Sequence, residues 1–156
     1  MKKFIFRCFI GILCLAVLAS ISFCAAVRHF TTDGNHLSKE AIFSLVKKNH
    51  SILLDASEAG QPEKAESIKG IREAFCKDGF AFFECGGYGM GSETGYYGFY
   101  YSPDDIAKPL LNGYPVCSEE DFLPEGNGYA YNEVEGDNRY YAERITNCFF
   151  YYEMHF

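Results

Sequence analysis

Apolar and polar residues alternate with a helical period in one part of the chain. Between residues 38 and 58, apolar positions recur at about the 3.6-residue repeat of an α-helix. Ser38 stands where an N-cap belongs, and Gly60 and Pro62 supply a stop signal. The pattern predicts one amphipathic helix, with Asn49-His50 as a point where it could break.

From Ile68 onward the pattern changes to short aromatic runs separated by Gly, Asp and Asn. Asp78-Gly79 tolerates the positive φ angles of a tight turn and predicts a hairpin. Residues 139–146 follow a second turn signal and fit either a strand or a helical turn. The other expected strands are residues 70–76, 80–85, 96–101, 129–134 and 148–156, the last of which alternates with one wholly apolar face.

Two stretches between these strands show no regular pattern. Gly86 to Gly91 lacks the spacing of a phosphate-binding loop and predicts a mobile connection, whose glycines would let a ligand approach the backbone. Residues 106–128 contain three prolines and the acidic group Glu119-Glu120-Asp121, and we assign them no regular structure. The expected fold is therefore α+β, with one helix covering a face of an antiparallel sheet of four to six strands.

The first 27 residues carry an export signal. Lys2, Lys3 and Arg7 precede a run without charged side chains, residues 8–27. About 20 apolar residues are needed to span a membrane, whereas a cleaved signal usually has roughly 7 to 15, so the length favours an anchor. Secretion after cleavage near Ala26 is the alternative. Because the basic cluster stays in the cytoplasm, we expect a tether, residues 28–36, and a single domain, residues 37–156, on the outside.

The exported part is strongly acidic. Without the three N-terminal cations, the fourteen Lys and Arg become 11 against 21 Asp and Glu, which gives a formal charge of −10. Phosphate backbones are bound through Lys and Arg, so this charge excludes nucleic acid as a partner. It favours cationic partners such as polycationic peptides or divalent metals, and simple solubility is the competing explanation.

The expected domain contains four cysteines, Cys76, Cys85, Cys117 and Cys148. An even number in an oxidising compartment allows two disulfides; the alternative is that the four are small buried hydrophobic side chains. The turn at Asp78-Gly79 places Cys76 and Cys85 four residues out of step, roughly 13 Å along the strand, so these two should not pair.

Catalytic and metal-binding signatures are weak. His155, with Glu153 on the same strand face and a cysteine such as Cys85, is the one constellation that suggests proton transfer. A solvated strand end is the ordinary explanation of this pair. Neither C-x-x-C nor H-x-x-x-H spacing nor a calcium-loop pattern occurs, so we expect no metal and no cofactor.

The twelve tyrosines suggest binding through rigid amphipathic side chains, with core packing as the competing explanation. The hairpin register also places Glu73 opposite Glu84, and like charges in that position destabilise a sheet unless a bulge, a nearby cation or a shared proton relieves them. The candidate binding residues are Tyr88, Tyr96, Tyr97, Tyr100, Glu73 and Glu84.

Two aromatic segments, residues 96–105 (YYGFYYSPDD) and 149–156 (FFYYEMHF), resemble those of small exported bacterial proteins. The resemblance covers the strand-rich half of the chain and brings no function with it. The leading hypothesis is a membrane-anchored, noncatalytic domain that binds a peptide, a protein or a cell-wall component. The alternatives are a small inhibitor or immunity-type protein acting on an exported enzyme, and an enzyme that uses His155, Glu153 and a cysteine.

The basic cluster before the apolar run predicts the orientation of the chain. Alkaline phosphatase fused after Phe156 should be active in intact cells, because its disulfides form only in an oxidising compartment. The measurement is enzyme activity in whole cells, followed by separation of membranes from medium. An inactive fusion would reverse the orientation, and active protein lacking residues 1–26 in the medium would replace the anchor by a cleaved signal.

Overall fold

The computed structural model describes residues 37–90 and 93–156 of the chain. The expected membrane segment, residues 8–27, and the tether, residues 28–36, lie outside the described residues. Within the described part of the chain, no helix is both long and apolar enough to cross a membrane.

The described residues begin with three helical segments: α2 (Lys39–Lys48), α3 (His50–Glu58) and the 3-10 helix η1 (Pro62–Ala65). Ser38 caps α2, because its Oγ accepts the backbone N–H of Ala41 at 3.3 Å. The expected helix is broken in two at Asn49, where the sequence allowed a break. The Asn49 side-chain amide donates to the Leu45 carbonyl at 2.8 Å, and its backbone, at φ −108° and ψ 17°, leaves the helical conformation.

A seven-stranded antiparallel sheet follows, with the strand order β1-β2-β3-β9-β8-β7-β6. A separate hairpin consists of β4 (Leu110–Leu111) and β5 (Tyr114–Pro115). The α+β class is confirmed, but the expected four to six strands of the sheet were too few, because the proline-rich stretch adds β6 to the sheet and also forms the separate β4–β5 hairpin. Residues 139–146 form a strand rather than a helical turn. The strands of the large sheet are β1 (Glu73–Lys77), β2 (Phe80–Met90), β3 (Glu93–Tyr101), β6 (Leu123–Glu125), β7 (Gly128–Asn132), β8 (Arg139–Thr146) and β9 (Phe149–His155).

The first hairpin has the turn and the register that the sequence predicts. Asp78 and Gly79 adopt positive φ angles of 51° and 84°. Glu73 pairs with Glu84. A β-bulge lies between Glu84 and Gly86, past Glu73, which is the first residue of β1. The bulge therefore does not change the pairing of Glu73 with Glu84 or relieve the opposition of the two carboxylates.

The prediction of a mobile glycine-rich connection is wrong for residues 86–90, which continue β2. Several glycines on these strands pair with tyrosines: Gly86 pairs with Tyr97, and Gly95 pairs with Tyr88. A Cβ atom on Gly86 would lie 2.5 Å from the Tyr97 hydroxyl, and one on Gly95 would lie 2.4 Å from the Tyr88 ring. The tyrosine rings therefore occupy the space that side chains would need at the glycines.

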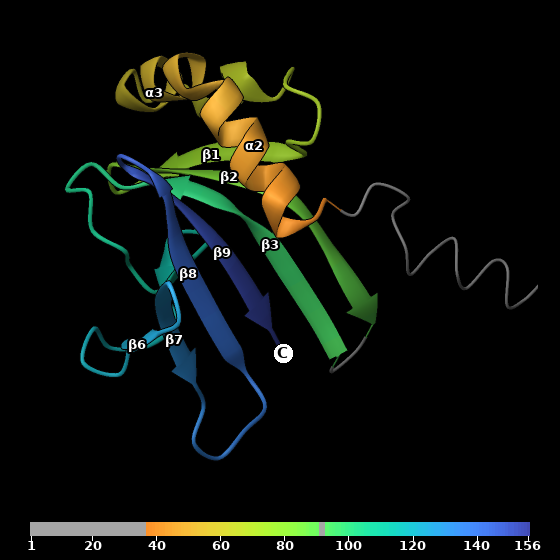
Figure 1. Cartoon of the computed structure of the whole chain (residues 1–156), viewed down its shortest axis with the longest axis vertical. Coiled ribbons are helices and arrows are strands. Elements are labelled where there is room, and N and C mark those ends of the chain that lie inside the picture. The colour runs from red at the N-terminus through yellow and green to blue at the C-terminus, as the bar shows by residue number, and fades with distance from the viewer. Residues whose placement is uncertain (1–36, 91–92) are drawn as a thin grey trace, which may run out of the picture. The chain divides into compact units, whose positions relative to one another are not determined.

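Aromatic side chains occupy both faces of the central strands β3 and β9. On one face, which we call the helix face, α2, α3 and η1 cover the sheet (Figure 1). Lys39 of α2 also forms an ion pair with Glu143 of β8. The core on this face joins helix residues Ile42, Val46 and Leu53 to strand residues Phe83, Phe99 and Phe149.

The opposite face, which we call the loop face, is covered by residues 103–122, the covering loop, which includes the β4–β5 hairpin. Two buried tyrosines hold this loop. The Tyr100 hydroxyl accepts the N–H of Lys108 at 2.7 Å and donates to its carbonyl at 3.0 Å. The Tyr140 hydroxyl donates to the carbonyl of Leu110 at 2.9 Å. Side-chain hydroxyls thus satisfy the backbone of a segment that has little regular structure of its own.

Removal of the Tyr140 hydroxyl should loosen the covering loop. In Tyr140→Phe the Leu110 carbonyl loses its partner, so the free energy of unfolding should fall by about 1–3 kcal/mol. Chemical denaturation measures this change, and Tyr96→Phe, on an exposed ring, is the control. Equal stability of Tyr140→Phe and the wild type would show that the hydroxyl does not hold the loop.

Candidate functional site

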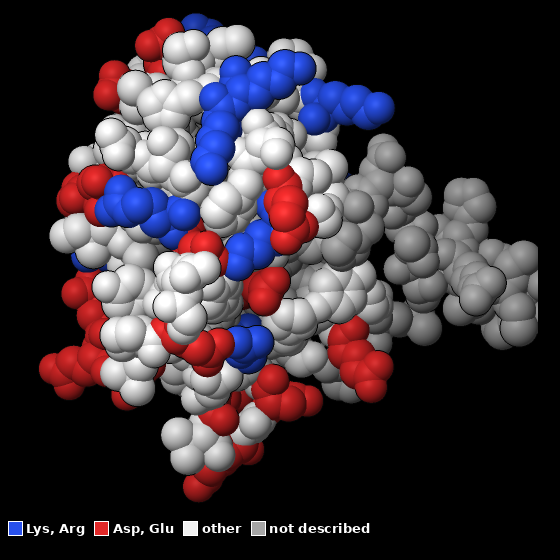
Figure 2. Space-filling model, in the orientation of Figure 1, with Lys and Arg blue, Asp and Glu red and all other residues white. Residues whose placement is uncertain are grey.

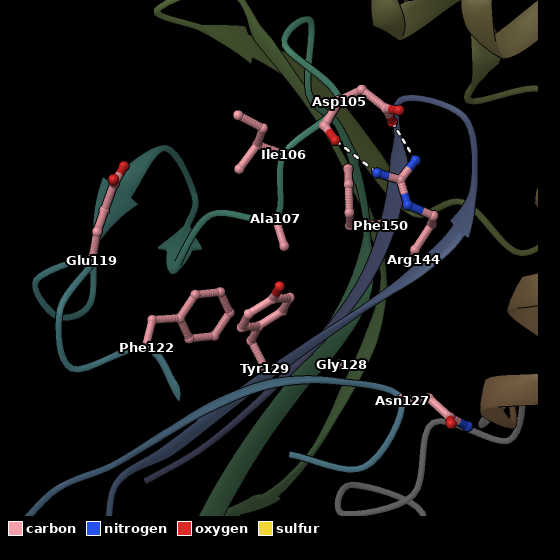
Figure 3. A pocket seen from close by; sticks show the side chains of 10 residues that line it. All are labelled: Asp105, Ile106, Ala107, Glu119, Phe122, Asn127, Gly128, Tyr129, Arg144 and Phe150. Carbon is pink, nitrogen blue, oxygen red and sulfur yellow. Dashed lines mark hydrogen bonds and ion pairs between the residues drawn. The ribbon is translucent and has the colours of Figure 1, made fainter. Parts of the chain in front are cut away.

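A cavity of about 520 Å³ lies on the loop face, between the covering loop and strands β7 to β9 (Figure 3). Ligand pockets usually have volumes of roughly 300–1,000 Å³. Figure 3 shows two aromatic rings on one side of the cavity and an ion pair across from them. The residues that give it its character are the aromatic Phe122, Tyr129 and Phe150 and the charged Asp105, Glu119 and Arg144.

Two aromatic rings form one wall of the cavity. Phe122, at the end of the covering loop, and Tyr129 of β7 have ring centroids 5.4 Å apart and planes inclined by 35°. Phe122 is 8% exposed, whereas Tyr129 is 43% exposed. Gly128 lets the chain reach this position, since a Cβ atom there would lie 2.2 Å from the Ala142 carbonyl oxygen. Tyr129 therefore offers a ring to a ligand while Phe122 supports it.

Arg144 of β8 lies on the opposite side of the cavity, and its contacts fix the guanidinium in one orientation. Its guanidinium carbon lies 4.9 Å from the centroid of the Phe150 ring. Its Nη1 donates to Oδ1 of Asp105 at 2.5 Å, and its Nη2 donates to the Asp105 carbonyl at 2.7 Å. Stacking and two hydrogen bonds fix a planar group that is still 46% exposed. Arg144 is thus a preformed donor at the cavity wall.

Asp105 is itself held by the turn between β8 and β9. Its backbone has a positive φ of 57°, and its Oδ1 accepts the N–H of Cys148 at 2.6 Å. The hydrogen bond from Cys148, followed by that from Arg144, holds the pKa of Asp105 below its ordinary value. The carboxylate is therefore ionised near neutral pH, and it neutralises the charge of Arg144.

The covering loop makes this side of the protein acidic. Residues 103–122 contain five acidic residues against Lys108, a formal charge of −4, and adding Arg144 gives −3. Residues 37–65, which contain the helices, hold four acidic and four basic residues and are neutral. Figure 2 shows basic side chains gathered over α2 on the helix face. The covering loop on the loop face is therefore acidic, whereas the helical layer on the helix face has no net formal charge.

The tyrosines proposed from the sequence do not line this cavity. The Tyr88 hydroxyl lies 2.5 Å from Nδ1 of His155. Tyr97 is buried in the core of the helix face, and Tyr100 is buried beneath the covering loop. Tyr96 is 39% exposed and lies outside the cavity lining. Tyr100 affects the cavity only through the covering loop, which its hydroxyl holds at Lys108 and which forms one side of the cavity.

The geometry around His155 gives little support to catalysis. Its Nε2 lies 3.8 Å from Oε1 of Glu153, and its Nδ1 faces the Tyr88 hydroxyl. Burial raises the pKa of Tyr88 above its ordinary value and that of Cys85 to about 12. Neither group is ionised near neutral pH, so neither supplies an activated nucleophile. Across residues 37–90 and 93–156, no cluster of three or more His, Cys, Asp or Glu side chains is placed to hold a metal ion.

The four domain cysteines are free thiols in the structure. Cys85 is buried in the core of the helix face, and Cys148 packs against the same core. Cys117 packs on the loop face, and Cys76 is exposed. Oxidation to disulfides stays a prediction, as does the absence of a Cys76–Cys85 link.

Glu73 and Glu84 form an acidic pair at the β1–β2 edge of the sheet, outside the cavity lining. Burial raises the pKa of Glu84 above 4.5, the Arg72 guanidinium acts in the opposite direction, and the Glu73 carboxylate adds to the rise. Arg72 is thus the nearby cation that the sequence called for, but it does not offset burial. Ionisation of Glu84 therefore opposes folding, and a ligand role for the pair stays a prediction.

The raised pKa of Glu84 predicts how stability depends on pH. The folded protein binds this proton more tightly than the unfolded chain, whose pKa is near 4.5, so stability falls as pH rises from 4.5 through the folded pKa. In Glu84→Gln this loss should disappear, and Glu73→Gln should reduce it. Melting temperatures at pH 4 and pH 7 measure the effect, with Glu135→Gln, on an exposed loop, as control. If the melting temperatures of Glu84→Gln and the wild type change by the same amount between pH 4 and pH 7, Glu84 does not cause the loss of stability.

The sequence pattern did not single out Phe122, Tyr129 or Arg144. Tyr129 did carry a signal, because it follows Gly128 at the start of an expected strand. The Arg144–Asp105 pair spans 39 positions, and no local motif connects the two residues. Their association follows only from the placement of the covering loop over β8.

No family model, no curated protein and no solved structure matches the chain.

Proposed function

We propose that this protein is a noncatalytic binding domain, anchored to the membrane on its outer side, with the cavity on the loop face as its ligand site. The observation that carries the proposal is the aromatic wall of Phe122 and Tyr129 facing an immobilised Arg144. Groups fixed before binding lose little conformational entropy when a ligand arrives. The N-terminal cations before residues 8–27 support the outer location.

The cavity suits an apolar or aromatic side chain presented by a peptide or a protein. Tyrosine and arginine are among the residues that carry most of the binding energy at interfaces, particularly when they border a pocket. Tyr129 offers the face of its ring, and Arg144 keeps N–H groups beyond its two bonds to Asp105. Those donors can bind backbone carbonyls on either side of the inserted side chain.

Insertion of a side chain fits this site better than addition of a strand to the sheet. β6, the edge strand beside the cavity, has only three residues, and one of them is Pro124. Proline has no backbone N–H to donate, and short edges protect a sheet from further pairing. The ligand is therefore held by its side chain rather than through a ladder of backbone hydrogen bonds.

A tryptophan-containing peptide tests the proposal directly, because the chain itself has no tryptophan. A pentapeptide with a central tryptophan flanked by serines should show a blue shift in fluorescence when titrated with the full-length protein in detergent. Tyr129→Ala should raise its Kd about tenfold, or about 1.4 kcal/mol.

The matched control is Tyr96→Ala, since Tyr96 and Tyr129 are 39% and 43% exposed and only Tyr129 lines the cavity. Its Kd should equal that of the wild type. Equal losses in both variants would place binding elsewhere, and the absence of a blue shift with neutral, basic and acidic peptides alike would refute the proposed function.

A further inference from the structure

We infer that the ligand of this cavity is a basic peptide segment, in which lysine or arginine flanks the inserted apolar side chain. The inference rests on the proposed function and adds the charge of the ligand. It comes from two features of the loop face: the charged side chains that line the cavity are already paired, whereas the covering loop beside it carries a net negative charge.

The interior of the cavity is electrically balanced. The guanidinium of Arg144 is bound by the carboxylate of Asp105 at 2.5 Å, and Glu119, the third charged residue of the lining, is bound by Lys108 at 2.8 Å. The other lining residues, among them Phe122, Tyr129 and Phe150, are uncharged. A charged ligand group placed inside would meet this closed ion pair and lose its own water. The part of the ligand that enters the cavity is therefore uncharged.

The covering loop, which forms one side of the cavity, has the opposite character. Lys108, the one basic residue of the covering loop, already bonds to Glu119 at 2.8 Å and lies 3.6 Å from Asp104. The two acidic residues that follow Glu119 in the sequence are exposed; they are Glu120 and Asp121. Cations that flank the inserted side chain meet this net negative charge, and an ammonium beside Tyr129 also gains attraction to its ring.

Charge placement also sets the direction of approach. The helical layer is neutral overall and carries basic side chains over α2 (Figure 2), whereas the covering loop has a formal charge of −4. The covering loop therefore attracts a basic segment more strongly than the helical layer does, and this attraction weakens as salt screens charges beyond roughly 10 Å at 0.1 M.

Three pentapeptides with a central tryptophan, flanked by lysines, serines or glutamates, separate charge from side-chain insertion. For the full-length protein in detergent, the lysine peptide should bind at least tenfold more tightly than the serine peptide at low salt. The glutamate peptide should bind more weakly than both. The preference for lysine should shrink to about threefold or less at 0.5 M salt.

Glu120→Lys should remove most of the preference for lysine, while Glu135→Lys, with the same charge change on the exposed β7–β8 connection, should keep it. Equal Kd values for the three peptides, with binding still dependent on Tyr129, would overturn this inference and leave the proposed function intact. Equal effects of the two lysine variants would also overturn it, by assigning the preference to net charge. Failure of all three peptides to bind would overturn both.

Discussion

The central strands β3 and β9 carry aromatic rings on both faces, and this pairing determines how the rest of the chain is arranged. On the loop face Tyr100 stacks on Phe150 with centroids 5.5 Å apart, and on the helix face Phe99 meets Phe149 at 6.3 Å. Rings of this size bury large apolar areas, so neither face can be left to water. The fold therefore needs two covers. The helices supply one, and a loop with little regular structure supplies the other.

Strand β8 connects both covers through two adjacent residues. Glu143 points to the helix face and pairs with Lys39 of α2, whereas Arg144 points to the loop face and pairs with Asp105 of the covering loop. Burial opposes ionisation of Glu143, but Lys39 and the Tyr141 hydroxyl outweigh it and lower its pKa below the usual value. Because strand side chains alternate, one dipeptide anchors both layers to the same strand. Removing one partner of either pair would leave a charge without its counter-ion.

Local signals in the sequence were sufficient for much of this fold, but not for the site. Asp78-Gly79 predicted the first turn and, through it, the opposition of Glu73 and Glu84, because a two-residue turn fixes register. The glycines of β2 were misread, since their role depends on tyrosines of the next strand rather than on their neighbours in sequence. The covering loop has no periodicity because buried hydroxyls and a salt bridge, rather than a regular backbone ladder, fix its course. Contacts of that kind join distant residues and leave no pattern in a single sequence.

The cavity follows from this way of covering a sheet. A helix laid over β7 and β8 would pack against Tyr129 and Arg144 along its length and bury them. The covering loop instead follows the positions where Tyr100 and Tyr140 can satisfy its backbone, near Lys108 and Leu110. It then returns to the sheet at Phe122, whose ring packs against that of Tyr129 and leaves Tyr129 43% exposed. The hydrogen bonds that fix the covering loop therefore also determine which part of the sheet the loop leaves uncovered. The exposed ring and the fixed guanidinium are held by a rigid framework, which is how loops on stable scaffolds come to carry binding sites.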